Sequence, residues 1–381
     1  MKGKHKNIIV HFLATAQRER LRSKLAKLVE WQPLARPEGG CTAIIGACSK
    51  LPDILMANLR CLSSSKWSEL KRVIVVMDCV KTSIPPGLES GVKNAFPELH
   101  IDLVYYSVAQ SALAERVKLP FVYSWLSWCI ALGHTTTANV LFHDYDSLLL
   151  STLNEKYRAF EASGAKVQGI RWYNGHGVEV DDHLATTFEA FMDTVWLRSL
   201  DPISLFNKMR IINGRSIDFD TTLDAQYRLL RRDERTTAPM EPDEIVHPSQ
   251  MIHQYTMFRH SPGARLPCFS IPMIPFFCYL SGRTDAIDCA TQSLKQEQRH
   301  ALNLLGDGTL INLSALTVEQ VDWQLKQMVR ACLSLSVKPD HRIYSYGLAL
   351  YRAIDTPLQY IWRGDFTDRQ RIWILAAESG G

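Results

Sequence analysis

Two aspartates separated by one residue, Asp144 and Asp146, are the side chains of this 381-residue chain that most directly suggest chemistry. They follow the apolar run 140–142, which has the composition of a buried strand. In an extended backbone, side chains at i and i+2 project to the same side, so both carboxylates can aim at one point beyond the strand. Oxygen ligands placed in this way suit Mg²⁺ or Mn²⁺, with water and phosphate oxygens completing the shell. A polar turn that merely caps a strand is the competing interpretation.

The elements that must position these aspartates alternate between strands and helices. Apolar runs predict buried strands at 42–47, 73–77, 101–106 and 138–142, and helical spacing predicts helices that begin at Leu51 and Pro120. This alternation predicts an α/β fold with a mainly parallel sheet covered by helices on both faces. Such sheets bind ligands beyond the carboxyl ends of their strands. Residues 47–50, Asp78 and the two aspartates all follow strand ends, so we expect them to converge at one edge.

Composition and charge limit the classes of function. The chain is 46% hydrophobic and 22% charged, as in ordinary soluble globular proteins. A net charge of +4, with dispersed basic residues, gives no reason to expect nucleic acid as a partner. No apolar run approaches the length of a transmembrane helix. The nine cysteines lie far apart without a C-x-x-C pair, which argues against zinc ribbons and disulfide frameworks and favours a reducing, cytoplasmic location.

The N-terminal segment is locally basic, with Lys2, Lys4 and Lys6 close together. The apolar stretch 8–13 that follows is too short for a secretory signal and is interrupted by His11. We interpret it as the beginning of an amphipathic helix whose basic residues continue to residue 24. Such a helix is expected to pack on its own protein, with peripheral attachment to a membrane surface as the alternative.

Residues 42–150 resemble the GT-A fold glycosyltransferases, most closely family 2. That family opens with a strand, a turn and a helix reading roughly I-x-x-x-N-x-P-x-x-L-x-x-x-L-x-S-L, and residues 44–64 read IIGACSKLPDILMANLRCLSS. The family's second strand ends in an aspartate, here Asp78, and a later strand closes with Asp-x-Asp. Ser49 and Lys50 depart from the Asn or Arg usual in the family, and Asp78 lacks the common Asp-Gly-Ser continuation.

The resemblance implies a site for a nucleoside diphosphate sugar. Asp146 would bind the metal directly, and Asp144 would contact metal, water or ribose. Asp78 would accept a hydrogen bond from the nucleobase, and the backbone from Ala47 to Ser49 would hold the base and ribose. The resemblance implies a GT-A domain that binds nucleotide sugar and acceptor (41–280), while the sequence pattern outside it predicts an N-terminal helical extension (1–40) and a C-terminal helical region (281–381).

Two further groups of residues are candidates for the same site. GT-A enzymes often complete the metal shell with a downstream histidine, and His253 is preferred over His247 and His260 because apolar neighbours would anchor it. All three lie in 247–275, a segment without clear period that we expect to be an ordered loop. Arg116 and Lys118 could pair with the diphosphate, with solvated surface charge as the alternative.

An inverting reaction would need a carboxylate to deprotonate the acceptor hydroxyl. Asp220 is the candidate for this base, with Asp218 and Asp224 as alternatives. The family's downstream acidic pair would fall near residues 221–222, which are threonines here, so the resemblance does not identify the base. Trp172 and Tyr173 could stack on a sugar ring or pack in the core.

The sequence therefore predicts a metal-dependent glycosyltransferase that moves a sugar from a nucleoside diphosphate donor, expected to be uridine-based, to a glycan or glycolipid. A sugar nucleotidyltransferase is one alternative, although residues 46–50 are sparse in glycine for its phosphate-binding loop. A non-catalytic module that binds nucleotide or glycan is another. Sequence leaves both open.

Overall fold

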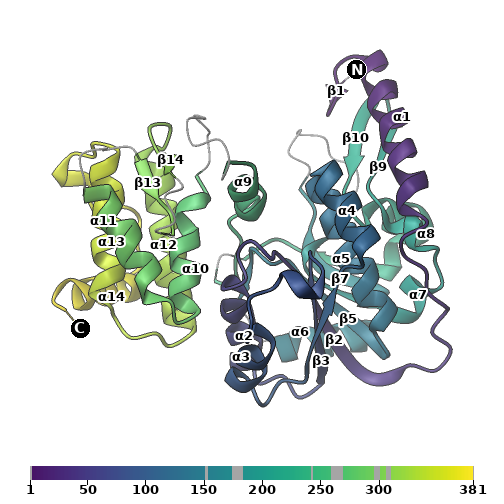
Figure 1. Cartoon of the computed structure of the whole chain (residues 1–381), viewed down its shortest axis with the longest axis horizontal. Coiled ribbons are helices and arrows are strands. Elements are labelled where there is room, and N and C mark those ends of the chain that lie inside the picture. Colours follow the sequence, from purple (N-terminus) through teal and green to yellow (C-terminus); the bar gives the residue numbers. More distant parts are fainter. Residues whose placement is uncertain are drawn as a thin grey trace. The chain divides into compact units, whose positions relative to one another are not determined.

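The computed structural model describes residues 2–150, 153–173, 183–241, 243–258, 269–295, 301–305 and 310–380. The chain forms two compact units, one made of Met1–Ser49, Lys66–Tyr145 and Thr152–Glu241, the other of Lys50–Ser65, Asp146–Ser151 and Pro242–Gly381 (Figure 1). The consecutive segments expected from the sequence, 1–40, 41–280 and 281–381, do not coincide with these units, because the second unit takes two short pieces from the first half of the chain.

The first unit is built on a seven-stranded sheet in the order β11-β7-β8-β5-β2-β3-β4. Its strands, in chain order, are β2 (Glu38–Ala47), β3 (Leu70–Met77), β4 (Ile101–Tyr105), β5 (Thr137–His143), β7 (Val167–Arg171), β8 (Ala185–Asp193) and β11 (Arg235–Ala238). Strands β2 to β5 pair in parallel, as does β11 with β7, while β8 runs antiparallel to β5 and β7. The predicted α/β fold with a mainly parallel sheet is confirmed, and it is consistent with the GT-A fold.

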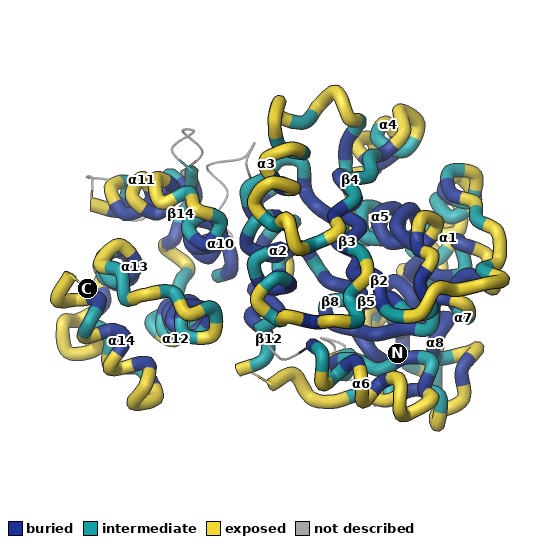
Figure 2. Tube along the Cα trace, turned by 90° about the horizontal axis from the view of Figure 1, so that it is seen from below, coloured by how far each residue is buried: buried dark blue, intermediate teal, exposed yellow. Residues whose placement is uncertain are grey.

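Helices cover this sheet, and α5 contributes most to its core. The helices of the first unit are α1 (Ile8–Leu25), α3 (Leu88–Ala95), α4 (Val108–Val117), α5 (Pro120–His134), α6 (Leu153–Ser163), α7 (Thr194–Arg198) and α8 (Leu223–Leu229). Much of α5 is buried (Figure 2), including Trp125, whose indole N–H donates to the carbonyl of Pro202 at 2.9 Å. Close packing of α5 on β2 requires glycine at position 46, because a Cβ there would lie 2.8 Å from Cβ of Ser127.

A second, three-stranded sheet joins α1 to the first unit. It has the order β1-β10-β9, formed by β1 (Lys2–Gly3), β9 (Lys208–Ile212) and β10 (Arg215–Phe219). Strands β9 and β10 form a hairpin whose turn residues Asn213 and Gly214 have φ of 50° and 72°, as expected of an Asn-Gly hairpin turn. Figure 1 shows α1 alongside these strands. The helix predicted at the N-terminus is therefore present.

The second unit is mainly helical. Its helices are α2 (Ile54–Ser64), α9 (Met251–Phe258), α10 (Ile274–Leu280), α11 (Thr284–Lys295), α12 (Val318–Ser334), α13 (His341–Ala353) and α14 (Asp368–Glu378). Two short antiparallel pairs accompany them: β6 (Leu148–Leu149) with β12 (Ile245–Val246), and β13 (Ala301–Asn303) with β14 (Leu310–Asn312). The segment expected to be a loop, 247–275, is helical over 251–258, which form α9. Residues 259–268 of this segment lie outside the described residues.

Several single turns of 3-10 helix complete the described structure: η1 (Lys81–Ser83), η2 (Pro202–Leu205), η3 (Arg232–Glu234), η4 (Ile271–Met273) and η5 (Leu358–Tyr360). Among the described helices, none combines the length and the apolar character that crossing a membrane requires. Eight cysteines fall in the described part of the chain, and none of these eight forms a disulfide. The cytoplasmic location expected from cysteine spacing stays a prediction.

Candidate functional site

The two aspartates lie where β5 ends and the chain turns toward β6. Residues 140–142 are fully buried at the centre of the sheet, and burial then alternates residue by residue. Asp144 and Asp146 are partly exposed, whereas Tyr145 and Ser147 are buried. Burial therefore alternates beyond the strand, through a turn at residues 145–146, which leaves both aspartates partly exposed while their neighbours anchor the backbone.

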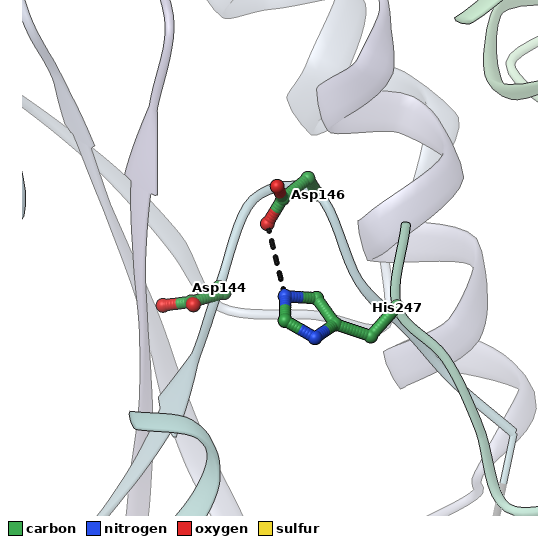
Figure 3. Close-up of side chains that lie close together, drawn as sticks. All are labelled: Asp144, Asp146 and His247. Atoms are coloured by element: carbon green, nitrogen blue, oxygen red, sulfur yellow. Dashed lines mark ion pairs between the residues drawn. The ribbon is translucent and has the colours of Figure 1, made fainter. Parts of the chain in front are cut away.

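Pairing of β6 with β12 brings His247 to Asp146. The antiparallel register sets Val246 opposite Leu148 and Ile245 opposite Leu149, so His247 follows directly after the paired residues. Its Nε2 atom lies 3.5 Å from Oδ1 of Asp146 (Figure 3). Both side chains are largely shielded, with 11% and 14% of their surface exposed. These two residues belong to the same unit, and a single residue separates Asp144 from Asp146.

Asp144, Asp146 and His247 form a group that could hold a metal ion. Each offers one ligand atom, and these atoms lie within 4.8 Å of one another. Two carboxylate oxygens and one imidazole nitrogen suit a divalent cation that accepts mixed ligands, and Mn²⁺ fits this set better than Mg²⁺, which prefers oxygen. Only three protein ligands are offered by the described residues, so further positions would be left for water or phosphate.

The histidine in this group differs from the one expected. His253 lies on α9 and is not part of the group; burial lowers its pKa. His260 lies outside the described residues. The sequence did contain a hint of His247, which directly follows the short apolar pair Ile245–Val246. Only the structure shows that this pair is a strand beside Leu148 and Leu149, close to Asp146.

The carboxyl ends of β2 and β3 are joined through Asp78. Its Oδ1 atom accepts a hydrogen bond from the backbone N–H of Ser49 at 2.7 Å, and its own N–H donates to the carbonyl of Ala47 at 3.1 Å. The structure thus brings together the three residues expected to hold a nucleobase and ribose. A carboxylate can accept several hydrogen bonds, and the one from Ser49 orders the loop.

The remaining candidates for ligand contact lie in the first unit. Arg116 is in the last turn of α4 and Lys118 caps that helix with φ of 53°; both are exposed, where cations complement the helix dipole. Trp172 stacks on Phe219 with ring centroids 5.6 Å apart and belongs to a small apolar cluster. Tyr173 is 64% exposed.

Three aspartates at the end of β10 were candidates for a catalytic base, and their surroundings differ. Asp218 forms an ion pair with Arg18 of α1 and lies 3.9 Å from Lys4. Asp224 is buried, which would raise its pKa, but hydrogen bonds and charge from Arg210 and the charge of Arg228 outweigh burial and lower it.

Asp220 instead has a neutral polar neighbour. Asn207 donates its amide N–H to Oδ1 of Asp220 at 3.0 Å, and Thr221 donates its hydroxyl to the Asn207 amide oxygen at 2.9 Å. The pKa of Asp220 is raised to about 6, mainly because the surrounding protein displaces water from the carboxylate, and secondly because Asp218 is negative. Taken over the whole residue, Asp220 is nonetheless exposed to solvent. Of the three, Asp220 is therefore best suited to accept a proton near neutral pH.

Comparison with models of known protein families finds no match, and neither does comparison with curated proteins. Solved structures are similar at low identity. A galactosyltransferase, LgtC, in complex with donor and acceptor sugar analogs is 9% identical, with a TM-score of 0.40 over 64% of this chain and 95% of that one. A mannosyltransferase from Pyrobaculum calidifontis in complex with GDP-Man and Mn²⁺ is 15% identical, with a TM-score of 0.31 over 86% and 96%.

The 4-diphosphocytidyl-2C-methyl-D-erythritol synthase from Anaerococcus prevotii is 16% identical, with a TM-score of 0.36 over 57% of this chain and 94% of that one. At these identities and TM-scores, likeness by itself assigns neither donor, metal nor acceptor to this chain. Those assignments depend on its own residues.

Proposed function

We propose that this protein is a metal-dependent glycosyltransferase that transfers a sugar from a nucleoside diphosphate donor, uridine-based, to a glycan or glycolipid. The observation that carries the proposal is the group of Asp144, Asp146 and His247, whose ligand atoms lie within 4.8 Å of one another at the end of a central strand. Departure of a diphosphate leaves negative charge that must be stabilised. A divalent ion held here would act as a Lewis acid on that charge without any proton transfer.

The protein side chains have separate tasks in this proposal. Asp144 and Asp146 bind the ion through oxygen, and His247 binds it through Nε2, taking the position that sequence alone gave to His253. Asp78 holds the loop at Ser49 and uses its remaining capacity on an N–H of the nucleobase. Arg116 would approach the diphosphate from the end of α4.

Asp220 is the proposed base for an inverting reaction. It would take the proton of the acceptor hydroxyl as the new glycosidic bond forms, and its pKa of about 6 leaves it ionised at neutral pH. Neither Asp218 nor Asp224 is placed as well, because each is engaged by cationic side chains.

The experiment that tests the proposal measures nucleotide binding with and without metal. Isothermal titration calorimetry with UDP, and separately with GDP, should show binding in Mn²⁺ that is lost with a chelator. Asp146→Asn and His247→Ala should weaken binding, whereas His253→Ala is the matched histidine control and should leave it unchanged. Equal affinity for UDP with and without Mn²⁺ would refute the metal site.

Release of UDP from UDP-sugars then separates the competing classes. A glycosyltransferase slowly hydrolyses its donor when no acceptor is present, with water in place of the hydroxyl. A nucleotidyltransferase instead forms pyrophosphate from UTP and a sugar phosphate, and a non-catalytic module does neither. Residues 46–50 contain few glycines, whereas a nucleotidyltransferase is expected to have a glycine-rich phosphate-binding loop there, so this alternative is less favoured.

A further inference from the structure

The first two turns of α1 expose an apolar face. Five large hydrophobic side chains are mostly or nearly half exposed there: Ile8 (52%), Ile9 (65%), Val10 (45%), Phe12 (59%) and Leu13 (61%). Ile8 and Phe12, like Ile9 and Leu13, are four residues apart and therefore neighbours on the helix surface. Single exposed apolar residues need no explanation, but a contiguous group of this kind marks an interaction site.

Polar residues of α1 face the protein instead. His11 is 3% exposed, and its Nδ1 lies 2.8 Å from the hydroxyl oxygen of Ser216 on β10. Arg18 and Arg22 lie on the same side of α1 as His11, about two and three turns further along. Arg18 pairs with Asp218, and the guanidinium of Arg22 lies over the ring of Phe206. In its first two turns α1 is thus oriented in reverse to a helix that buries its apolar side against its own protein, whereas its C-terminal end buries Leu25 in the core in the ordinary way. These polar contacts fix α1 so that the apolar face stays turned outward.

The rim of this face is basic. Four exposed cations flank it on α1 and the segment before it, Lys4, Lys6, Arg20 and Lys24. The acidic side chain of α1, Glu19, is already neutralised, since it pairs with Arg22 at 3.1 Å and with Lys208 at 3.5 Å. Lys4 lies 3.9 Å from Asp218, so the positive charge at the edge of the apolar centre is carried mainly by Lys6, Arg20 and Lys24.

We infer that this face binds the surface of an anionic lipid membrane. Apolar side chains would enter the boundary of the acyl chains while the lysines and arginines meet lipid phosphates, which is how amphipathic helices bind in the plane of a membrane. A second copy of the chain is a poorer occupant, because a two-fold contact sets the same basic rim against itself. This inference is independent of the proposed reaction.

The test is sedimentation of the full chain with vesicles of phosphatidylcholine alone or mixed with phosphatidylglycerol. Binding is expected to the anionic vesicles and to weaken with salt, because screening reduces the attraction between lipid and cations. Phe12→Glu with Leu13→Glu should lower the fraction bound by about tenfold or more, since charge replaces the side chains that enter the lipid. Both residues are exposed, so the melting temperature should not change.

Helix α14 offers a matched control. Ile372 and Leu375 are 68% and 62% exposed, and changing both to glutamate adds the same charge elsewhere. This variant should bind vesicles like the parent chain. Lys6→Glu with Lys24→Glu should weaken binding to anionic vesicles and leave the small binding to neutral ones unchanged.

Three results would overturn the inference. One is equal binding to neutral and anionic vesicles. Another is binding that survives Phe12→Glu with Leu13→Glu. The third is a concentration-dependent dimer, seen by analytical ultracentrifugation, that the same variant disperses, because it would assign the face to a second copy.

Discussion

Nε2 of His247 lies 3.5 Å from Oδ1 of Asp146, although the two residues are far apart in the chain. The short β6–β12 pair creates this proximity, since Val246 is paired with Leu148. A distance of 3.5 Å is long for a hydrogen bond. Two groups held this close are in position to share one cation, which is the basis of the first prediction.

Mn²⁺ should stabilise the protein through this group. A ligand that binds only the folded state raises the free energy of unfolding by an amount set by its concentration relative to its dissociation constant. The melting temperature should rise with Mn²⁺, measured by scanning calorimetry, and the rise should disappear in Asp146→Asn and His247→Ala. An undiminished rise in both variants would place the ion elsewhere.

Asp78→Ala should weaken UDP binding but not pyrophosphate binding. Loss of a hydrogen-bonded partner from a nucleobase site costs about 1–3 kcal/mol, which calorimetry resolves. Asp78→Asn is the matched control for loop order, because its amide oxygen can still accept from the Ser49 N–H while the charge is lost. If both ligands weaken equally in Asp78→Ala, the residue only orders the loop.

Transfer should depend on the ionisation of Asp220. Its pKa is raised to about 6, so the rate should fall as pH drops through that value and the base becomes protonated. Stability should change in the opposite sense: the folded state binds the proton more tightly than the unfolded chain, so unfolding free energy falls as pH rises from about 4 to 6.

The variant Asp220→Asn tests both halves of this argument. It should abolish transfer while retaining metal-dependent UDP binding, and its melting temperature should gain on the parent chain as pH rises from about 4 to 6. Unchanged transfer in Asp220→Asn would remove it as the base.

Arg18 should tune Asp220 from a distance. The positive charge of Arg18 lowers the pKa of Asp220 directly. Arg18 also pairs with Asp218, whose negative charge raises the pKa of Asp220. Arg18→Gln should therefore move the acidic limb of the pH–rate profile to higher pH. Arg20→Gln is the control, because Arg20 is exposed on the same helix. Identical profiles for the two variants would show that α1 has no electrostatic effect on Asp220.

Gly46→Ala should destabilise the first unit. Its Cβ would lie 2.8 Å from Cβ of Ser127, so α5 or β2 must shift, at a cost of about 1–3 kcal/mol as in other overpacked cores. Gly133→Ala on α5 meets nothing within 4 Å and should be neutral or stabilising. Urea denaturation measures both. Equal stability of the two variants would contradict the close approach of α5 to β2.

Sequence alone determined the features that depend on local pattern. Apolar runs and helical spacing predicted β2, β3, β4, β5 and α5, because burial of one side of a strand or helix imposes its period on the chain. The period of two predicted that Asp144 and Asp146 lie on the same side; both are partly exposed, but the chain turns at 145–146 and the two carboxylates point in different directions (Figure 3). Convergence of Ala47, Ser49 and Asp78 followed from the rule that parallel strands present their carboxyl ends at one edge.

Tertiary structure decided which distant residues complete these local patterns. The sequence favoured His253 over His247 because of its apolar neighbours, and only the β6–β12 pair shows that His247 is the one beside Asp146. Asp218 and Asp220 likewise differ in their tertiary partners, because α1 brings Arg18 into an ion pair with the first while Asn207 donates to the second. The outward apolar face of α1 has the same origin. A single sequence shows the hydrophobic period of each helix and strand, but it does not show which distant element packs against it. That packing determines which side chains pair, how far they are buried and how their pKa values shift.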